Sequence, residues 1–187
     1  AAAERLAPLF IKHRYALVVL TAKNFLGWAE QEAALLANKT LPEIASIPGL
    51  DAHKPLLLGY SAGGQMALMM WQQNAGKLGG LILDAAYPID PRSRKVLPLP
   101  PGAAVKETPF FVLVGEKDGG SQLWKQVEEG WRKAGVPLTV QYLPGRGHEW
   151  LFGGEQCAAL EKWLEDLAKS QPPGDPAKPV PAKAPQK

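Results

Sequence analysis

Ser61 lies in a sequence pattern that is typical of an activated serine nucleophile. The apolar residues 56–58 run directly into Gly-Tyr-Ser-Ala-Gly-Gly at 59–64, and a helical pattern begins immediately afterwards. This is Gly-x-Ser-x-Gly between a strand and a helix, where a sharp turn exposes the hydroxyl and small neighbours let strand and helix approach closely. We therefore predict that Ser61 is a nucleophile and that the amide of Ala62, at the helix N-terminus, stabilises the oxyanion that forms.

The same segment could instead be a plain strand-helix turn or a glycine-rich phosphate loop. A phosphate loop fits poorly, because the segment contains neither Gly-x-Gly-x-x-Gly nor Gly-Lys followed by Ser or Thr. The position between an apolar strand and a helix is the context that the nucleophile requires, and it favours that interpretation.

His148 is the candidate general base. A serine hydroxyl is a weak nucleophile until a base removes its proton, so we expect a histidine in a loop after a late strand. His148 follows the apolar run 138–143 in Pro-Gly-Arg-Gly-His-Glu-Trp. His13 and His53 precede the serine at the starts of predicted strands, which is the opposite edge of a parallel sheet.

A carboxylate is needed to fix the tautomer of the histidine, and Asp118 is the first candidate. It follows the apolar run 109–115 in Gly-Glu-Lys-Asp-Gly-Gly, which gives the chain order Ser, Asp, His that accompanies a nucleophile of this type. Asp84, at the end of the preceding apolar run, and Glu116, in the same turn as Asp118, remain alternatives.

Strands and helices that could carry these residues alternate along the chain. Apolar runs predict buried strands at 15–21, 55–59, 80–84, 109–115 and 138–143. Helical patterns occur at 4–13, 28–46, 62–74, 121–134 and 155–169. Such alternation is typical of a parallel sheet between two helix layers. We therefore expect an α/β fold, a three-layer α/β/α sandwich with a mainly parallel sheet.

Composition limits the kinds of site and partner. Cys157 is the only cysteine and no Cys/His spacing would hold zinc, so we predict no metal site. The net charge is +3, and several of the lysines lie near the C-terminal end, so nothing indicates a nucleic-acid partner. No apolar stretch reaches the roughly 20 residues of a membrane span. Compartment and oligomeric state stay open.

The two ends of the chain differ from its body. From residue 171 the composition is dominated by Pro, Ala and Lys, which predicts an extended tail at 171–187 after a folded domain at 1–170. Several prolines in 87–108 predict a long loop, of a kind that often forms a lid or a binding loop. The chain begins with Ala1 and a helix, and we expect the domain to be N-terminally incomplete.

The segments Gly-Tyr-Ser-Ala-Gly-Gly, Gly-Glu-Lys-Asp and Pro-Gly-Arg-Gly-His-Glu-Trp together resemble the α/β-hydrolase superfamily. Most similar are its bacterial dienelactone-hydrolase-like and predicted phospholipase/carboxylesterase-type esterases, over about residues 4–168. The resemblance implies a cofactor-free reaction in which Ser61 forms an acyl-enzyme and His148 activates the water that releases it. It also implies a second oxyanion donor from a loop ahead of the first helix, for which residues 23–25 are the alternative here.

The predicted activity is hydrolysis of a carboxylic ester in a small-molecule substrate. Tyr60, Trp28 and Trp150 are the candidate substrate contacts, since they lie in or beside loops at the expected active edge, although packing roles are equally open for the two tryptophans. The alternatives are an acyltransferase or a peptidase with the same triad, or a catalytically weak binding module of a larger hydrolase.

Overall fold

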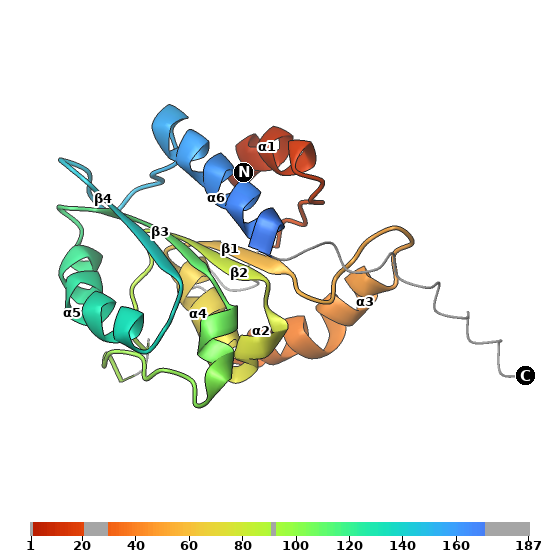
Figure 1. The fold of residues 1–187 in the computed structure, drawn as a ribbon, viewed down its shortest axis with the longest axis horizontal. Helices are drawn as coiled ribbons and strands as arrows, with labels where there is room; N and C mark the ends of the chain where they lie inside the picture. Colours follow the sequence, from red (N-terminus) through yellow and green to blue (C-terminus); the bar gives the residue numbers. More distant parts are fainter. Residues whose placement is uncertain (1, 21–29, 91–92, 171–187) are drawn as a thin grey trace, which may run out of the picture.

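A parallel sheet forms the centre of the molecule in the computed structural model, which describes residues 2–20, 30–90 and 93–170. The sheet is 4-stranded in the order β1-β2-β3-β4, so that strands consecutive in the chain are neighbours (Figure 1). The strands are β1 (Leu56–Tyr60), β2 (Gly80–Asp84), β3 (Phe110–Gly115) and β4 (Leu138–Leu143).

Helices precede, connect and follow the strands. Their bounds are η1 (Ala2–Leu6), α1 (Ala7–Lys12), α2 (Glu30–Leu35), the π-helical η2 (Leu36–Thr40), α3 (Leu41–Ala45), α4 (Ala62–Asn74), η3 (Ala75–Lys77), η4 (Ala103–Glu107), α5 (Gly119–Lys133) and α6 (Gly154–Ser170). None of the described helices combines the length and the apolar character that crossing a lipid bilayer would need.

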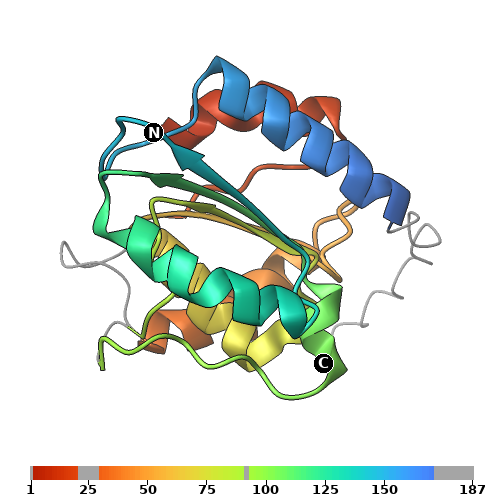
Figure 2. The ribbon, with the colours of Figure 1, turned by 60° about the vertical axis from the view of Figure 1, so that its left-hand side comes forward.

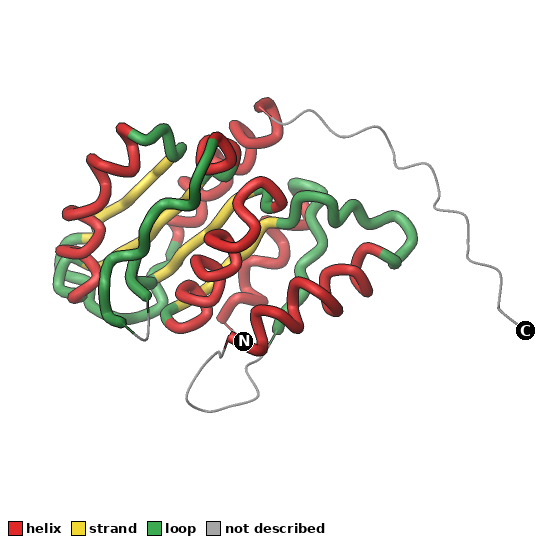
Figure 3. Tube along the Cα trace, turned by 90° about the horizontal axis from the view of Figure 1, so that it is seen from below, coloured by secondary structure: helices red, strands yellow, loops and turns green. Residues whose placement is uncertain are grey.

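The helices lie in two layers, one on each face of the sheet (Figure 2). On one face α1 and α6 bury Phe10 and Leu164 against Phe111 of β3. On the other face α4 and α5 bury Trp71 and Trp124 against the same sheet, and the view from below shows helices crossing in front of the strands (Figure 3). The strands are covered on both sides, as their nearly unbroken apolar sequences predict. The expected three-layer α/β sandwich with a parallel sheet is confirmed.

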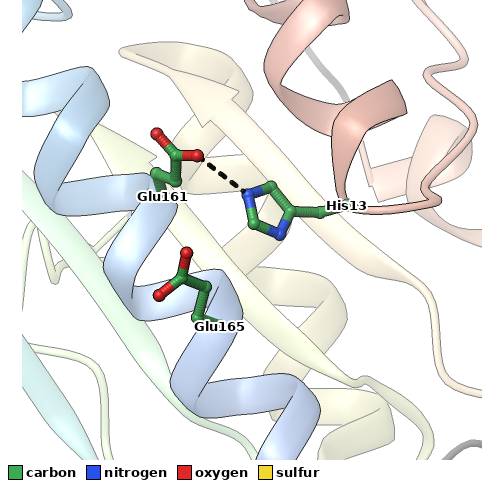
Figure 4. Close-up of side chains that lie close together, drawn as sticks. All are labelled: His13, Glu161 and Glu165. Atoms are coloured by element: carbon green, nitrogen blue, oxygen red, sulfur yellow. Dashed lines mark hydrogen bonds and ion pairs between the residues drawn. The ribbon is translucent and has the colours of Figure 1, made fainter.

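In the layer formed by α1 and α6, charged as well as apolar contacts join the two helices. Lys12 pairs with Glu161 of α6, and His13 Nε2 lies 3.4 Å from Glu161 Oε1, with Glu165 one turn further along the same helix (Figure 4). These groups are partly or largely exposed, so we attribute most of the attachment to the buried apolar contacts of Phe10.

The predicted bounds agree with the structure for β2, β4 and α4, but the strand expected at 15–21 is wrong. Residues 15–20 have no regular secondary structure, and residue 21 lies outside the described residues. Val18, Val19 and Leu20 are 47%, 40% and 41% exposed. An apolar run becomes a strand only when its backbone groups pair with a neighbouring strand, and no described strand pairs with this one.

The described part of the helix expected at 28–46 is helical from Glu30 to Ala45, where α2, the π-helical η2 and α3 follow one another directly. Pro42 lies in the first turn of α3 and has no N–H to donate to the turn before it. The wider π-helical turn of η2 immediately precedes it. The proline removes one backbone donor, and the π-helical turn before it accommodates this loss while the backbone stays helical at Thr40 and Leu41.

Candidate active site

The carboxyl ends of all four strands lie at one edge of the sheet, because the sheet is parallel. Ser61 follows β1 directly, Asp84 is the last residue of β2, Asp118 follows β3 and His148 lies in the loop after β4. Ligand sites of open parallel sheets lie at this edge. The topology therefore brings together residues that are up to 87 positions apart in the sequence.

The backbone at Ser61 has an unusual conformation, with φ 49° and ψ −116°. Few residues other than glycine adopt a positive φ, and holding one costs about 1–3 kcal/mol. Two hydrogen bonds keep the turn in place: Ser61 N–H donates to Asp84 O at 2.8 Å, and Gln65 N–H donates to Ser61 O at 3.1 Å. The turn is thus anchored to β2 on one side and to the first turn of α4 on the other.

Positions on both sides of this turn must be glycine, because the surrounding chain lies too close to leave room for a side chain. A Cβ atom on Gly59 would lie 2.4 Å from the backbone of Gly63, and one on Gly64 would lie 2.3 Å from the Cβ of Ala86. Both distances are far below van der Waals contact. Gly59, which the sequence pattern singled out together with Gly63, and Gly64, which follows the pattern, therefore serve the close approach of β1, α4 and the chain after β2.

A continuous chain of hydrogen bonds joins Ser61, His148 and Asp118. Ser61 Oγ lies 2.8 Å from His148 Nε2, and His148 Nδ1 lies 2.9 Å from Asp118 Oδ2. A carboxylate only accepts, so Nδ1–H donates to Asp118 and Nε2 is left as the acceptor for the Ser61 hydroxyl. The Asp118 side chain is 1% exposed and that of His148 is 41% exposed, so the carboxylate is shielded while the imidazole faces solvent.

Asp118 is also the N-cap of α5, and its carboxylate is held by further donors. Oδ1 accepts from Gly120 N–H at 3.1 Å and from the Tyr87 hydroxyl at 2.6 Å. Tyr87 was not among the residues predicted from the sequence. Its position three residues after β2, at the carboxyl edge, is the only sequence signal that could have indicated it, because a tyrosine in a proline-rich loop has no distinctive pattern.

The turn that carries Asp118 and the loop that carries His148 are bonded to each other. Glu116 N–H donates to Leu143 O at 3.0 Å, and Lys117 N–H donates to Arg146 O at 2.9 Å. A Cβ atom on Gly115 would lie 2.5 Å from the carbonyl oxygen of Arg146, so this position must also be glycine. Glu116 itself is exposed and shares no hydrogen bond with His148 among the described residues.

Asp84, the other candidate acid, is fully buried and faces a different group. Its Oδ1 and Oδ2 lie 3.3 Å and 3.1 Å from the amide nitrogen of Leu151, which donates to them. Burial raises the pKa of Asp84 to about 7, although the Leu151 bond and the charges of Arg146 and His148 act in the opposite direction. Asp84 thus holds the chain that follows His148 and makes no hydrogen bond to the imidazole.

The raised pKa of Asp84 should make the free energy of unfolding depend on pH. The folded chain binds this proton more tightly than the unfolded chain, whose carboxyl has a pKa near 3.8. Stability from this group is therefore complete below that pH and is lost as pH rises to about 7. Denaturant titrations from pH 4.5 to 7.5 should show Asp84→Asn gaining stability relative to the unmodified chain as pH rises. The exposed Asp51→Asn variant is the control, and parallel curves for Asp84→Asn would contradict the expectation.

A small cavity of about 140 Å³ adjoins the serine. Its lining residues are Ser61, Gln65, Ala85, Tyr87, Arg94 and His148. Most of these lining residues carry a polar or charged side chain.

Neither of the described candidate substrate contacts, Tyr60 and Trp150, lines this cavity. The Tyr60 ring is 37% exposed, with its centroid 5.9 Å from that of His148 and 5.8 Å from that of Trp150. Trp150 packs on Tyr60 and does not line the cavity.

Ala62 is the first residue of α4, where amides have no acceptor within the helix. Trp28 and residues 23–25, the alternative second oxyanion donor, lie outside the described residues.

Several solved structures share this arrangement of sheet and helices. A putative alpha/beta hydrolase from Agrobacterium tumefaciens is 17% identical, with a TM-score of 0.65, over 90% of this chain and 77% of that one. A carboxylesterase from Bacillus cereus is 20% identical, with a TM-score of 0.59, over 88% and 82%. SOBER1 of Arabidopsis thaliana is 21% identical, with a TM-score of 0.54, over 73% of this chain and 63% of its own.

The present chain thus spans less than two thirds of the length of SOBER1. No protein-family model matches the sequence, and no curated protein matches it either. At these identities the similarity concerns the fold, and it agrees with the parallel sheet, the two helix layers and the strand-turn-helix at Ser61. The chain has the α/β-hydrolase fold.

Proposed function

We propose that this chain is a serine hydrolase that cleaves carboxylic esters through an acyl-enzyme on Ser61. The observation that carries the proposal is the hydrogen-bond chain from Ser61 Oγ through His148 to Asp118, at 2.8 Å and 2.9 Å, beside a cavity. A nucleophile, a base and an acid in this geometry are the parts that acyl transfer needs. The carboxylesterases among the structural neighbours support an ester as the substrate.

The geometry suggests a sequence of proton transfers. His148 Nε2 takes the proton of the Ser61 hydroxyl as Oγ bonds to the ester carbonyl carbon, and the carbonyl oxygen becomes negatively charged. In this proposal the amide of Ala62, the first residue of α4, donates to that oxygen. His148 then returns the proton to the departing alcohol, which leaves the acyl group on Ser61. A water that gives a proton to His148 attacks the acyl carbon. The bond from that carbon to Ser61 Oγ then breaks, and His148 returns the proton to Oγ as the acid departs.

Asp118 takes no proton in this scheme. Its buried carboxylate keeps the Nδ1 proton of His148 in place and stabilises the imidazolium that forms in each half-reaction. The surrounding donors from Tyr87 and Gly120 compensate for its burial.

A series of esters of increasing acyl chain length should test both the proposed activity and the size of the acyl site. The part of the cavity that the described residues enclose, about 140 Å³, is close to the roughly 150 Å³ that holds a benzene-sized molecule, so we expect it to suit a short acyl group. Among p-nitrophenyl esters, kcat/KM should be highest from acetate to butyrate and fall by about 10-fold or more at octanoate, as expected for methylenes that a pocket cannot accept.

A fluorophosphonate probe should label the chain covalently in the same experiments. A chain that neither labels nor turns over any of these esters would be a binding module rather than an enzyme. Turnover that rises steadily with chain length would retain the serine hydrolase but contradict the short acyl site.

A further inference from the structure

Tyr87 makes closer contacts with the proposed triad than any other described residue outside it. Its hydroxyl donates to Asp118 Oδ1 at 2.6 Å, and its oxygen lies 3.3 Å from His148 Nδ1. We propose that Tyr87 is a positioning residue, which fixes the Asp118 carboxylate so that Oδ2 stays directed at His148. This inference rests on the proposed function for its catalytic consequence, although the positioning itself does not depend on the substrate.

The hydrogen bonds of Asp118 have only one consistent set of directions. A carboxylate accepts and does not donate, so Tyr87 and Gly120 donate to Oδ1 while His148 donates to Oδ2. Without the Tyr87 hydroxyl, a single backbone bond would hold Oδ1, and the carboxylate could rotate about its Cβ–Cγ bond. Rotation would lengthen the bond to His148 in a place where the carboxylate has almost no access to water.

The Tyr87 ring is itself fixed by its surroundings. A Cβ atom on Gly120 would lie 2.5 Å from Tyr87 Cδ1, so the ring occupies the space that a side chain at 120 would need. On its other side the ring meets His148 edge-on, with centroids 5.6 Å apart. A hydroxyl on a ring held between α5 and the imidazole is preorganised, which is what positioning a catalytic group requires.

The Tyr87 hydroxyl also remains a donor over a wide pH range. Burial, followed by the hydrogen bond to Asp118, raises the pKa of Tyr87 to about 12. The phenol therefore keeps its proton under all conditions in which esters are commonly assayed. The Tyr60 ring also lies near His148, at a tilted angle, but shares no hydrogen bond with the triad among the described residues, so we assign the two tyrosines different roles.

Tyr87→Phe tests the role because it removes the hydroxyl and keeps the ring. A matched control is Tyr142→Phe, which removes a hydroxyl that donates to Glu128 Oε2 at 2.8 Å, away from the triad. Loss of a hydrogen bond to a charged group should lower kcat of Tyr87→Phe by about 10- to 100-fold. KM for p-nitrophenyl acetate should change little, because the missing bond orients the triad rather than the substrate. Tyr142→Phe should keep the kcat of the unmodified chain.

Proton NMR of the His148 Nδ1–H provides a readout that needs no substrate. This resonance should be present in the unmodified chain and in Tyr142→Phe, and should move upfield and broaden in Tyr87→Phe as the bond to Asp118 loosens. Unchanged kcat and an unchanged resonance in Tyr87→Phe would overturn the inference and leave the proposed function intact. An unmodified chain without turnover, but with the shifted resonance in Tyr87→Phe, would instead overturn the proposed function and support the positioning role.

Discussion

Replacing Ser61 by alanine should abolish covalent labelling by a fluorophosphonate and lower ester turnover by about 10⁴- to 10⁶-fold. The substitution removes the single atom that would form the acyl-enzyme. The turn should persist, because the bonds that hold it, from Ser61 N–H to Asp84 O and from Gln65 N–H to Ser61 O, involve only the backbone. Residual activity would come from substrate binding and from the oxyanion donors.

The measurement is a gel-based labelling assay together with steady-state kinetics on a short p-nitrophenyl ester. Ser46→Ala is a suitable control, since Ser46 is an exposed residue at the end of α3 whose hydroxyl donates to the carbonyl oxygen of Glu43. The control should label and turn over like the unmodified chain. Labelling that survives in Ser61→Ala, at any other serine, would refute the assignment of the nucleophile.

Asp118→Asn should lower kcat by up to about 10⁴-fold with little effect on the fold. The hydrogen-bond directions explain the size of the effect. If the Asn oxygen accepts from Tyr87 and Gly120 as Oδ1 does now, its NH₂ group faces His148 Nδ1. An NH₂ group donates, so Nδ1 would have to accept and the proton would move to Nε2. His148 in that tautomer cannot take the proton of Ser61.

Asp84→Asn is the matched comparison, and its effect on kcat should be far smaller. Its carboxyl bonds to the amide of Leu151, and an asparagine oxygen can accept the same bond. Both variants change one buried carboxyl group to an amide at the same sheet edge, which makes the two substitutions comparable in size and position. If Asp84→Asn caused the larger loss of kcat, the acid of the triad would be Asp84.

Much of the fold could be predicted because the two central strands, β2 and β3, are buried throughout and the edge strands β1 and β4 are partly buried. The apolar runs at 80–84 and 138–143 coincide with β2 and β4, and the helix predicted at 62–74 coincides with α4. Once the strands are taken as parallel, their carboxyl ends must meet, and the residues after them come together. The pairing of Ser61 with His148 follows from this topology as much as from the motif around the serine.

Other features depend on distances that a sequence does not contain. The apolar run at 15–20 has the composition of a strand, but pairing decides whether it becomes one. Asp84, Glu116 and Asp118 all end or follow strands at the same edge, and only the geometry shows which one faces His148. Tyr87 was not predicted for the same reason. Its proposed role depends on a hydrogen bond to Asp118, which the sequence alone does not reveal.

Hydrogen bonds between the loops group the residues of the site into two units, and each unit is held together by its own bonds. Asp118 and His148 lie on the β3–β4 side, where Lys117 N–H and Arg146 O join their loops, whereas Ser61 is anchored to β2. A shear of one pair of strands against the other would therefore stretch the bond between Ser61 and His148 and leave that between His148 and Asp118 intact. The bond from Leu151 N–H to Asp84 spans the two units and resists such a shear. Asp84, whose carboxyl group makes no hydrogen bond to either side chain, thus adds to the β2–β3 ladder in keeping the nucleophile aligned with its base.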